Sequence, residues 1–180
     1  MNEKNKAIFL DRDGVINKEI SYLSDPQDFE FIEGSIEALK ILKQKGFLLI
    51  IITNQAGIAR GYFTEEILNK IHDKMISILK HNKIELDSIY YCPHHPDFTG
   101  PCNCRKPKPG MILKATLKYN LDLSESFMVG DTLNDIETGK AAHCKTVLVL
   151  TGYGKKEQRK ISNIIPDMVV NNLMEFAINI

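Results

Sequence analysis

Short apolar runs alternate along the chain with segments whose apolar residues repeat every three or four positions. The run FLLIIIT at 47–53 carries no charge, which is typical of a strand covered on both faces. Segments 35–45 and 64–79 show the helical repeat, and Ser35 and Thr64 stand where helix caps are expected. Further strands are predicted at 7–10, 86–91, 126–130, 145–150 and 167–170, and further helices at 111–119, 134–142, 155–161 and 173–178.

Strands that alternate with helices predict an α/β fold, here a Rossmann-like three-layer sandwich with a mostly parallel central sheet. Ligands of such sheets bind beyond the carboxyl ends of the strands. The chain has 180 residues, of which 43% are hydrophobic and 26% charged. This length and composition indicate one globular domain over residues 1–180.

The charge balance excludes one class of partner. Lys plus Arg is 23 and Asp plus Glu is 23, so no net positive field attracts a nucleic acid. The first residues, MNEKNK, are polar, and no run approaches the ~18 apolar residues of a membrane span. We therefore expect a cytoplasmic monomer that binds neither nucleic acid nor membrane.

The first predicted strand ends in a pair of acids, in the stretch IFLDRDGVIN. Side chains two positions apart in an extended chain point to one side, so Asp11 and Asp13 are expected to face one volume while Arg12 points elsewhere. Two close carboxylates are explained by a divalent cation or by a division of chemical roles. The alternative is an ordinary strand-to-loop turn, because Asp and Gly are common turn residues and Gly14 follows the two acids.

Two other strand ends supply groups that suit a phosphate. The second strand runs into Thr53, Asn54 and Gln55, which offer a hydroxyl, amides and backbone N–H groups. The segment CRKPKPG, which follows the third strand, supplies two cations, Arg105 and Lys106. We predict that these five residues bind the substrate.

The fourth strand leads into VGDTLND, with Asp131 just beyond it and Asp135 one helical turn later. Acids would repel a phosphate unless a cation lies between them. Mg²⁺, which prefers a few carboxylates, water and substrate phosphate, resolves this conflict. The predicted Mg²⁺ ligands are Asp11, Asp13 and Asp131, and Asp135 is left without a role.

Phosphoryl transfer is the chemistry that this set predicts. Asp11 attacks phosphorus and forms an aspartyl phosphate, while Asp13 protonates the leaving oxygen and later deprotonates the attacking water. Thr53 and Lys106 stabilise the charge on the phosphoryl oxygens.

The loop CPHHPDFTGPCNC holds a second candidate metal site. Cys92, His94, Cys102 and Cys104 offer three thiolates and an imidazole, a set suited to a closed structural Zn²⁺ site. His95 is an alternative to His94. Free thiols in a proline-shaped turn, and a nucleic-acid-binding zinc knuckle, are the other interpretations.

Three further residues that can perform chemistry are predicted to be structural. His72 and His81 lie on or just after the second helix with no acidic partner in view, so we expect them in packing or at the surface. Cys144 stands in an apolar setting and is expected to be a small buried side chain.

Four motifs in order, DRDGV, the Thr of TNQ, Lys106 and GDTLND, resemble the haloacid dehalogenase-like phosphatase superfamily. CPHHP and CNCRKPKPGM are similar to its capless branch, which implies a fold with no cap domain and a zinc-bound loop at 92–109. The resemblance implies the zinc ligands Cys92, His94, Cys102 and Cys104, substrate recognition by Arg105, and sugar contacts near Glu19 and Tyr22.

The same resemblance implies a Mg²⁺-dependent phosphatase that removes the 7-phosphate of a heptose bisphosphate, in the synthesis of surface carbohydrate. Histidinol phosphate is the alternative substrate. A phosphoacceptor signalling domain is the rival of another class, but such domains place the accepting Asp after the third strand. Here the acid pair follows the first strand and the third is followed by Cys92.

Overall fold

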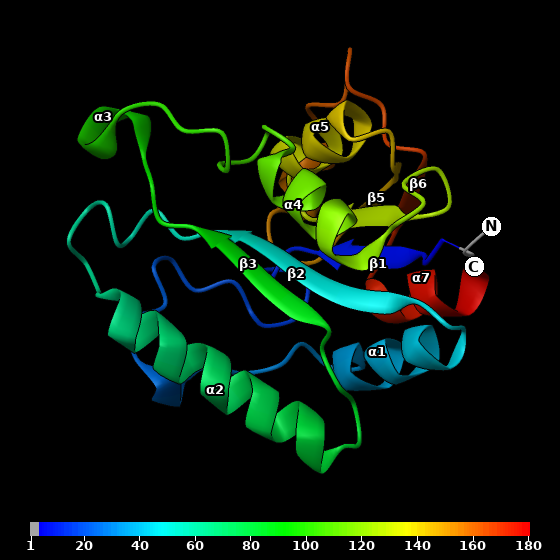
Figure 1. The fold of residues 1–180 in the computed structure, drawn as a ribbon, viewed down its shortest axis with the longest axis horizontal. Coiled ribbons are helices and arrows are strands. Elements are labelled where there is room, and N and C mark those ends of the chain that lie inside the picture. Colours follow the sequence, from blue (N-terminus) through cyan, green and yellow to red (C-terminus); the bar gives the residue numbers. More distant parts are fainter. Residues whose placement is uncertain (1–3) are drawn as a thin grey trace.

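The computed structural model describes residues 4–180 (Figure 1). The first three residues of the polar leader lie outside the described residues. Within residues 4–180, none of the helices combines the length and the apolar character that crossing a membrane requires.

Six parallel strands form one sheet in the order β3-β2-β1-β4-β5-β6. The predicted α/β class is confirmed, and the sheet is parallel throughout. The central strand β1 has the sequence AIFL and is completely buried, as expected for a strand covered on both faces. The strands are β1 (Ala7–Leu10), β2 (Leu48–Asn54), β3 (Ser88–Cys92), β4 (Phe127–Gly130), β5 (Lys145–Val149) and β6 (Met168–Val170).

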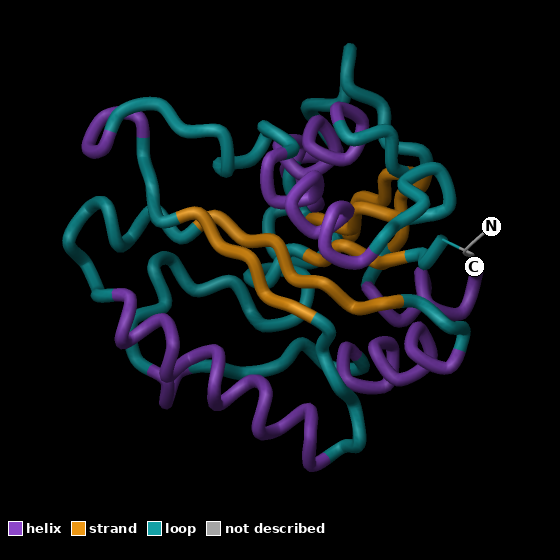
Figure 2. Tube along the Cα trace, in the orientation of Figure 1, coloured by secondary structure: helices purple, strands orange, loops and turns teal. Residues whose placement is uncertain are grey.

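Helices cover both faces of the sheet, as Figure 2 shows in purple beside the orange strands. Apolar residues of α1, α2 and α7 form one core with one face, and those of α4 pack against the other, where α5 also lies. The helices are α1 (Ser35–Gln44), α2 (Glu65–His81), α3 (Pro96–Thr99), α4 (Gly110–Tyr119), α5 (Leu133–Ala141), α6 (Gly154–Gln158) and α7 (Leu173–Asn179), with a 3₁₀ turn η1 (Pro26–Asp28).

The helix starts show where the capping predictions succeed and fail. Thr64 caps α2, because its hydroxyl accepts the N–H of Ile67. The prediction for Ser35 is wrong: Gly34, with φ 78°, occupies the cap position of α1. The Ser35 hydroxyl instead lies within hydrogen-bond distance of the carbonyls of Ile16 and Ile32, which ties the helix to the loop after β1.

Two connections could have held an inserted domain, and neither does. The chain between β1 and α1 contains only loops and η1, and the chain between β3 and α4 contains only the cysteine-rich loop with the short α3, which was not predicted. The carboxyl ends of the strands are therefore left for loops to cover, as a capless fold requires.

Candidate active site

A cavity of about 290 Å³ lies at the carboxyl ends of the strands. Asp11 follows β1, Thr53 and Asn54 end β2, and Asp131 follows β4. Because parallel strands end at the same edge of the sheet, residues far apart in the sequence meet here. The lining includes nearly every predicted site residue: Asp11, Asp13, Glu19, Tyr22, Thr53, Asn54, Gln55, Arg105, Lys106 and Asp131.

Lys106 lies at the floor of this cavity and is 3% exposed. Its Nζ is 2.9 Å from Oδ2 of Asp11 and 2.6 Å from Oδ1 of Asp135, and it donates to the Ile52 carbonyl at 3.1 Å. Burial disfavours the ammonium, but the two carboxylates outweigh burial and raise the pKa of Lys106. Lys106 is therefore a permanent cation beside the expected nucleophile.

Three carboxylates surround this one cation. Oxygens of Asp11, Asp131 and Asp135 lie within 4.8 Å of one another. Burial and the neighbouring carboxylates raise the pKa of Asp11 to about 7 and that of Asp131 to about 8, although the charge of Lys106 acts in the opposite direction. With all three ionised and only Lys106 opposing them, the group carries excess negative charge. Buried oxygen ligands with excess negative charge fit a hard divalent cation such as Mg²⁺.

Asp135 belongs to this cluster, although the sequence left it without a role. Its Oδ2 accepts the Thr132 N–H at 3.1 Å and the Thr132 hydroxyl at 2.6 Å, which completes a capping box at the start of α5. The T-x-x-D spacing was the signal that could have revealed this. Asp135 thus fixes the helix start with one oxygen and faces Lys106 with the other.

Asp131 is held by the backbone around it. Its Oδ2 accepts the N–H of Tyr153 at 2.7 Å, so the loop after β5 orients the carboxylate. Sequence reasoning did not identify Tyr153. Gly14 approaches the same oxygen: a Cβ there would lie 2.1 Å from Oδ2, and its φ of 78° favours glycine. The glycine of DRDGV therefore makes room for Asp131.

Asp13 lies in a different environment from Asp11. Its carboxylate accepts hydrogen bonds from Arg12, from Asn17 at 2.9 Å and from Gln55 at 3.0 Å. The expectation that Arg12 points elsewhere is wrong, because its guanidinium folds back onto Asp13 at 2.8 Å. Burial opposes ionisation, but Arg12 and the other donors lower the pKa of Asp13. Among the described residues, the carboxylate cluster does not include Asp13.

The residues at the carboxyl end of β2 contact the protein as well as the cavity. The side-chain amide of Asn54 pairs with the backbone of Lys106, accepting its N–H at 3.0 Å and donating to its carbonyl at 3.2 Å. Gln55 donates to the hydroxyl of Thr53 at 2.9 Å and to Asp13. Asn54 thus positions Lys106, while Thr53, buried and hydrogen-bonded, faces the cavity.

Three loops form the rim. Glu19 lies within 3.4 Å of the Tyr153 hydroxyl, and burial raises its pKa. Tyr22, with φ 56°, is exposed and packs edge-on against Tyr62 at 4.7 Å. Arg105 donates to the His94 carbonyl at 3.2 Å. The 19–22 segment and the cysteine-rich loop thus both border the opening.

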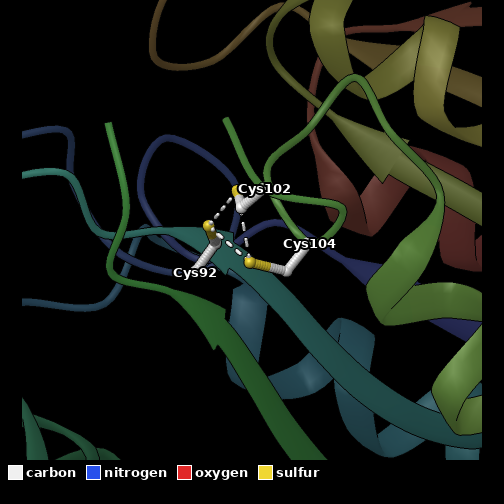
Figure 3. Close-up of side chains that lie close together, drawn as sticks. All are labelled: Cys92, Cys102 and Cys104. Atoms are coloured by element: carbon white, nitrogen blue, oxygen red, sulfur yellow. Dashed lines mark hydrogen bonds between the residues drawn. The ribbon is translucent and has the colours of Figure 1, made fainter. Parts of the chain in front are cut away.

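The three cysteines of the loop converge, as Figure 3 shows. The sulfur of Cys92 lies 2.8 Å from that of Cys104 and 3.6 Å from that of Cys102, and Cys102 and Cys104 are 3.5 Å apart. These thiols are free, and a cluster of soft ligands immediately before Arg105 and Lys106 fits Zn²⁺. Among residues 4–180, the imidazole of His94 is not part of the clustered group.

Both ring nitrogens of His95, the alternative ligand, have other partners. Its Nε2 lies 3.0 Å from a guanidinium nitrogen of Arg60, which can only donate, so Nε2 accepts and Nδ1, 3.6 Å from Oδ2 of Asp97, carries the proton. His95 is therefore engaged elsewhere, and His94 stays the predicted fourth ligand.

Comparisons with known proteins agree with this geometry. A family model described as HAD-hydrolase-like matches residues 103–176. A relative from Pasteurella multocida, named D-glycero-beta-D-manno-heptose-1,7-bisphosphate 7-phosphatase, is 48% identical over 91% of this chain and 94% of its own. The chain belongs to the HAD-like hydrolase family. A relative of the same name from Escherichia coli is 48% identical over 81% of this chain and 80% of its own.

The solved structures give the same result for this HAD-like hydrolase. The crystal structure of D,D-heptose 1,7-bisphosphate phosphatase from B. bronchiseptica, complexed with magnesium and phosphate, matches with a TM-score of 0.89 and 37% identity over 96% of both chains. The corresponding phosphatase from Burkholderia thailandensis matches with a TM-score of 0.74 and 28% identity over 97% of both. The protein is a phosphoric monoester hydrolase, as the motifs predict.

The raised pKa values of Asp11 and Asp131 predict how Mg²⁺ changes stability. Both exceed the ordinary value of 3.8, so at these two groups the folded protein binds more protons than the unfolded chain up to about pH 8. Without Mg²⁺, the free energy of unfolding therefore falls as pH rises from 6.5 to 8. The lowered pKa of His72 acts mainly below 6.5, the ordinary pKa of histidine, so this window avoids its contribution. Mg²⁺, which binds the ionised form, raises Tm by several degrees more at pH 8 than at 6.5, since about 1 kcal/mol shifts Tm by roughly 2–4 °C.

Thermal melts of dialysed protein with and without Mg²⁺ measure this difference, and dialysis without chelator avoids stripping any metal from the cysteine-rich loop. Asp131→Asn is the control, which should melt higher than wild type without Mg²⁺ at pH 8 and gain little from it. An equal Mg²⁺ gain at both pH values contradicts the cluster as the binding site.

The cysteine loop predicts a zinc content that depends on particular side chains. Purified protein should hold about one zinc per chain, and Cys102→Ser and His94→Ala should each lower this content. His95→Ala and Cys144→Ala are the matched controls and should retain it. Elemental analysis measures the metal. Full zinc in Cys102→Ser, or loss in His95→Ala but not His94→Ala, contradicts the ligand set.

Proposed function

We propose that this enzyme removes the 7-phosphate of a D-glycero-D-manno-heptose 1,7-bisphosphate with the help of Mg²⁺. The observation that carries the substrate is the 48% identity, over 91% of the chain, to a relative named for that reaction. The product would be a heptose 1-phosphate, ready for nucleotide activation in the synthesis of surface carbohydrate. Substrate and product would both be charged sugar phosphates, which do not cross membranes unaided, so we place the reaction in the cytoplasm.

The proposed Mg²⁺ ligands are Asp11 and Asp131, whose carboxylates face each other in the cluster. Bound there, Mg²⁺ supplies positive charge that neutralises these carboxylates and polarises a phosphoryl oxygen. Asp13 was expected as a third ligand. Among the described residues its carboxylate lies outside the cluster of Asp11, Asp131 and Asp135, so we assign this side chain to proton transfer instead.

Asp11 is the proposed nucleophile. Its Oδ1 accepts the N–H of Arg12 at 2.7 Å, and its Oδ2 faces Lys106, so the carboxylate is held in place where it lines the cavity. Attack on phosphorus forms an aspartyl phosphate and releases the sugar oxygen. Lys106 and the Thr53 hydroxyl, both buried beside the cavity, stabilise charge on the transferred group.

Asp13 is the proposed acid and base. Its side chain is 19% exposed and lines the cavity, so it can reach the bond between phosphorus and the sugar. The ionised form suits removal of a proton from the water that cleaves the aspartyl phosphate. For the preceding step the group must be protonated, and an approaching phosphate dianion raises its pKa through like charge.

The remainder of the sugar is expected to contact the rim. Arg105 offers a guanidinium to the second phosphate or to hydroxyls, and Glu19 and Tyr22 face the opening from the loop after β1. Asn54 and Gln55, whose amides bond to the protein, contribute by positioning Lys106 and Asp13. Histidinol phosphate would use the same acids and lysine, so it differs only at this rim.

Direct comparison of substrates tests the proposed function. We expect kcat/KM for the heptose 1,7-bisphosphate to exceed that for histidinol phosphate by at least about a hundredfold, because the rim has a cation for a second phosphate. Phosphorus NMR should show loss of the 7-phosphate and retention of the 1-phosphate. Asp11→Asn, nearly isosteric, should release no phosphate while its zinc content stays normal. Faster turnover of histidinol phosphate, or cleavage at position 1, contradicts the assignment.

A further inference from the structure

Among residues 4–180, Arg12 is the largest fully buried residue, and its side chain is 1% exposed. A buried guanidinium is costly unless its N–H groups are paired. Its Nε lies 3.2 Å from Oδ1 of Asp13, and its Nη2 lies 2.9 and 2.8 Å from Oδ1 and Oδ2. One side of the guanidinium therefore forms several hydrogen bonds to the carboxylate of the next residue, Asp13.

The other terminal nitrogen of Arg12 contacts His72. Its Nη1 lies 3.2 Å from Nε2 of His72, which sits on the buried face of α2 and is 6% exposed. A guanidinium can only donate, so Nε2 must be the acceptor and the imidazole must be neutral, with its proton on Nδ1. Burial first, and then the charge of Arg12, lower the pKa of His72 to about 3. The ring is therefore fixed in the state that the contact requires.

The three side chains form a continuous chain from α2 to the cavity. We propose that His72 is a positioning residue for catalysis: by accepting from Arg12 it fixes the guanidinium plane, and the guanidinium fixes the carboxylate of Asp13 toward the leaving oxygen. This inference rests on the proposed role of Asp13 as proton donor. It assigns a function to a histidine that the sequence indicates only as a packing residue.

The geometry explains why packing alone does not account for His72. An apolar residue of similar volume would fill the same space on α2, but Nη1 would then lose this acceptor. Since Nε and Nη2 both bond to Asp13, rotation of the guanidinium toward another acceptor pulls the carboxylate against its bonds to Asn17 and Gln55. A displacement of about 1 Å in a reacting group can cost about a hundredfold in rate.

Leaving-group dependence distinguishes positioning of the acid from a general loss of structure. A sugar alkoxide needs a proton as it leaves, whereas p-nitrophenolate leaves without one. For each variant we compare kcat/KM, which reports the first half-reaction only, on the heptose bisphosphate and on p-nitrophenyl phosphate. His72→Leu should lose about tenfold on the sugar phosphate and less than about twofold on the aryl ester.

Two conservative variants keep the test valid if His72→Leu folds poorly. In His72→Gln the amide oxygen reaches about as far as Nε2 and can accept from Arg12, so sugar phosphate turnover should recover to within about threefold of wild type. His72→Asn carries the same amide on a shorter side chain and should remain as impaired as His72→Leu. Met75→Ala, a buried change on the same helix, is the stability control and should affect both substrates equally.

Asp13→Asn separates failure of this inference from failure of the proposed function. It should show a large selective loss on the sugar phosphate. If Asp13→Asn loses equally on both substrates, the proposed proton donor is wrong and the inference falls with it. If Asp13→Asn is selective but His72→Leu is not, or if Gln and Asn variants behave alike, only the role of His72 is overturned. If the heptose bisphosphate is not cleaved, the proposed substrate is wrong, and fructose 1,6-bisphosphate replaces it as the alkyl ester.

Discussion

The placement of one buried lysine among three carboxylates governs the rest of this structure. Lys106 pairs with Asp11 and Asp135, and Asp131 completes the group. A buried charge is tolerated only with partners, so the lysine holds the acids together, and the three acids when ionised still lack two positive charges. With all three acids ionised the group carries excess negative charge, which is the condition for binding a divalent cation and then a phosphate.

The surrounding fold can be understood as support for this group. Three strand ends bring Asp11, Thr53 and Asp131 to one edge. Lys106 belongs to no helix or strand, so its position depends on the loop that carries it. The amide of Asn54 pairs with its backbone, and the cysteine cluster lies immediately before it in sequence. Zinc would therefore serve catalysis indirectly, by restraining the loop from which the lysine extends.

Sequence reasoning predicts the parts of this arrangement that depend on periodicity and on strand ends. The parallel sheet, the helices and the gathering of Asp11, Lys106 and Asp131 follow from patterns of this kind. It does not predict contacts set by side-chain direction in loops. Arg12 was expected to diverge from Asp13 because strands alternate, yet the chain leaves the strand at Leu10, and the guanidinium turns back. His72 was considered only for an acidic partner, whereas its partner is the guanidinium of Arg12, sixty positions away in sequence.

The central claim is that the carboxylate group repels phosphate until a divalent cation balances it. Isothermal titration of inorganic phosphate into the zinc-loaded protein, with and without Mg²⁺, measures this coupling most directly. The account predicts that saturating Mg²⁺ strengthens phosphate binding at least about tenfold, and that phosphate strengthens Mg²⁺ binding by the same factor. Phosphate affinity that is equal in both conditions would show that Lys106 and its neighbours bind phosphate unaided, and would contradict the account.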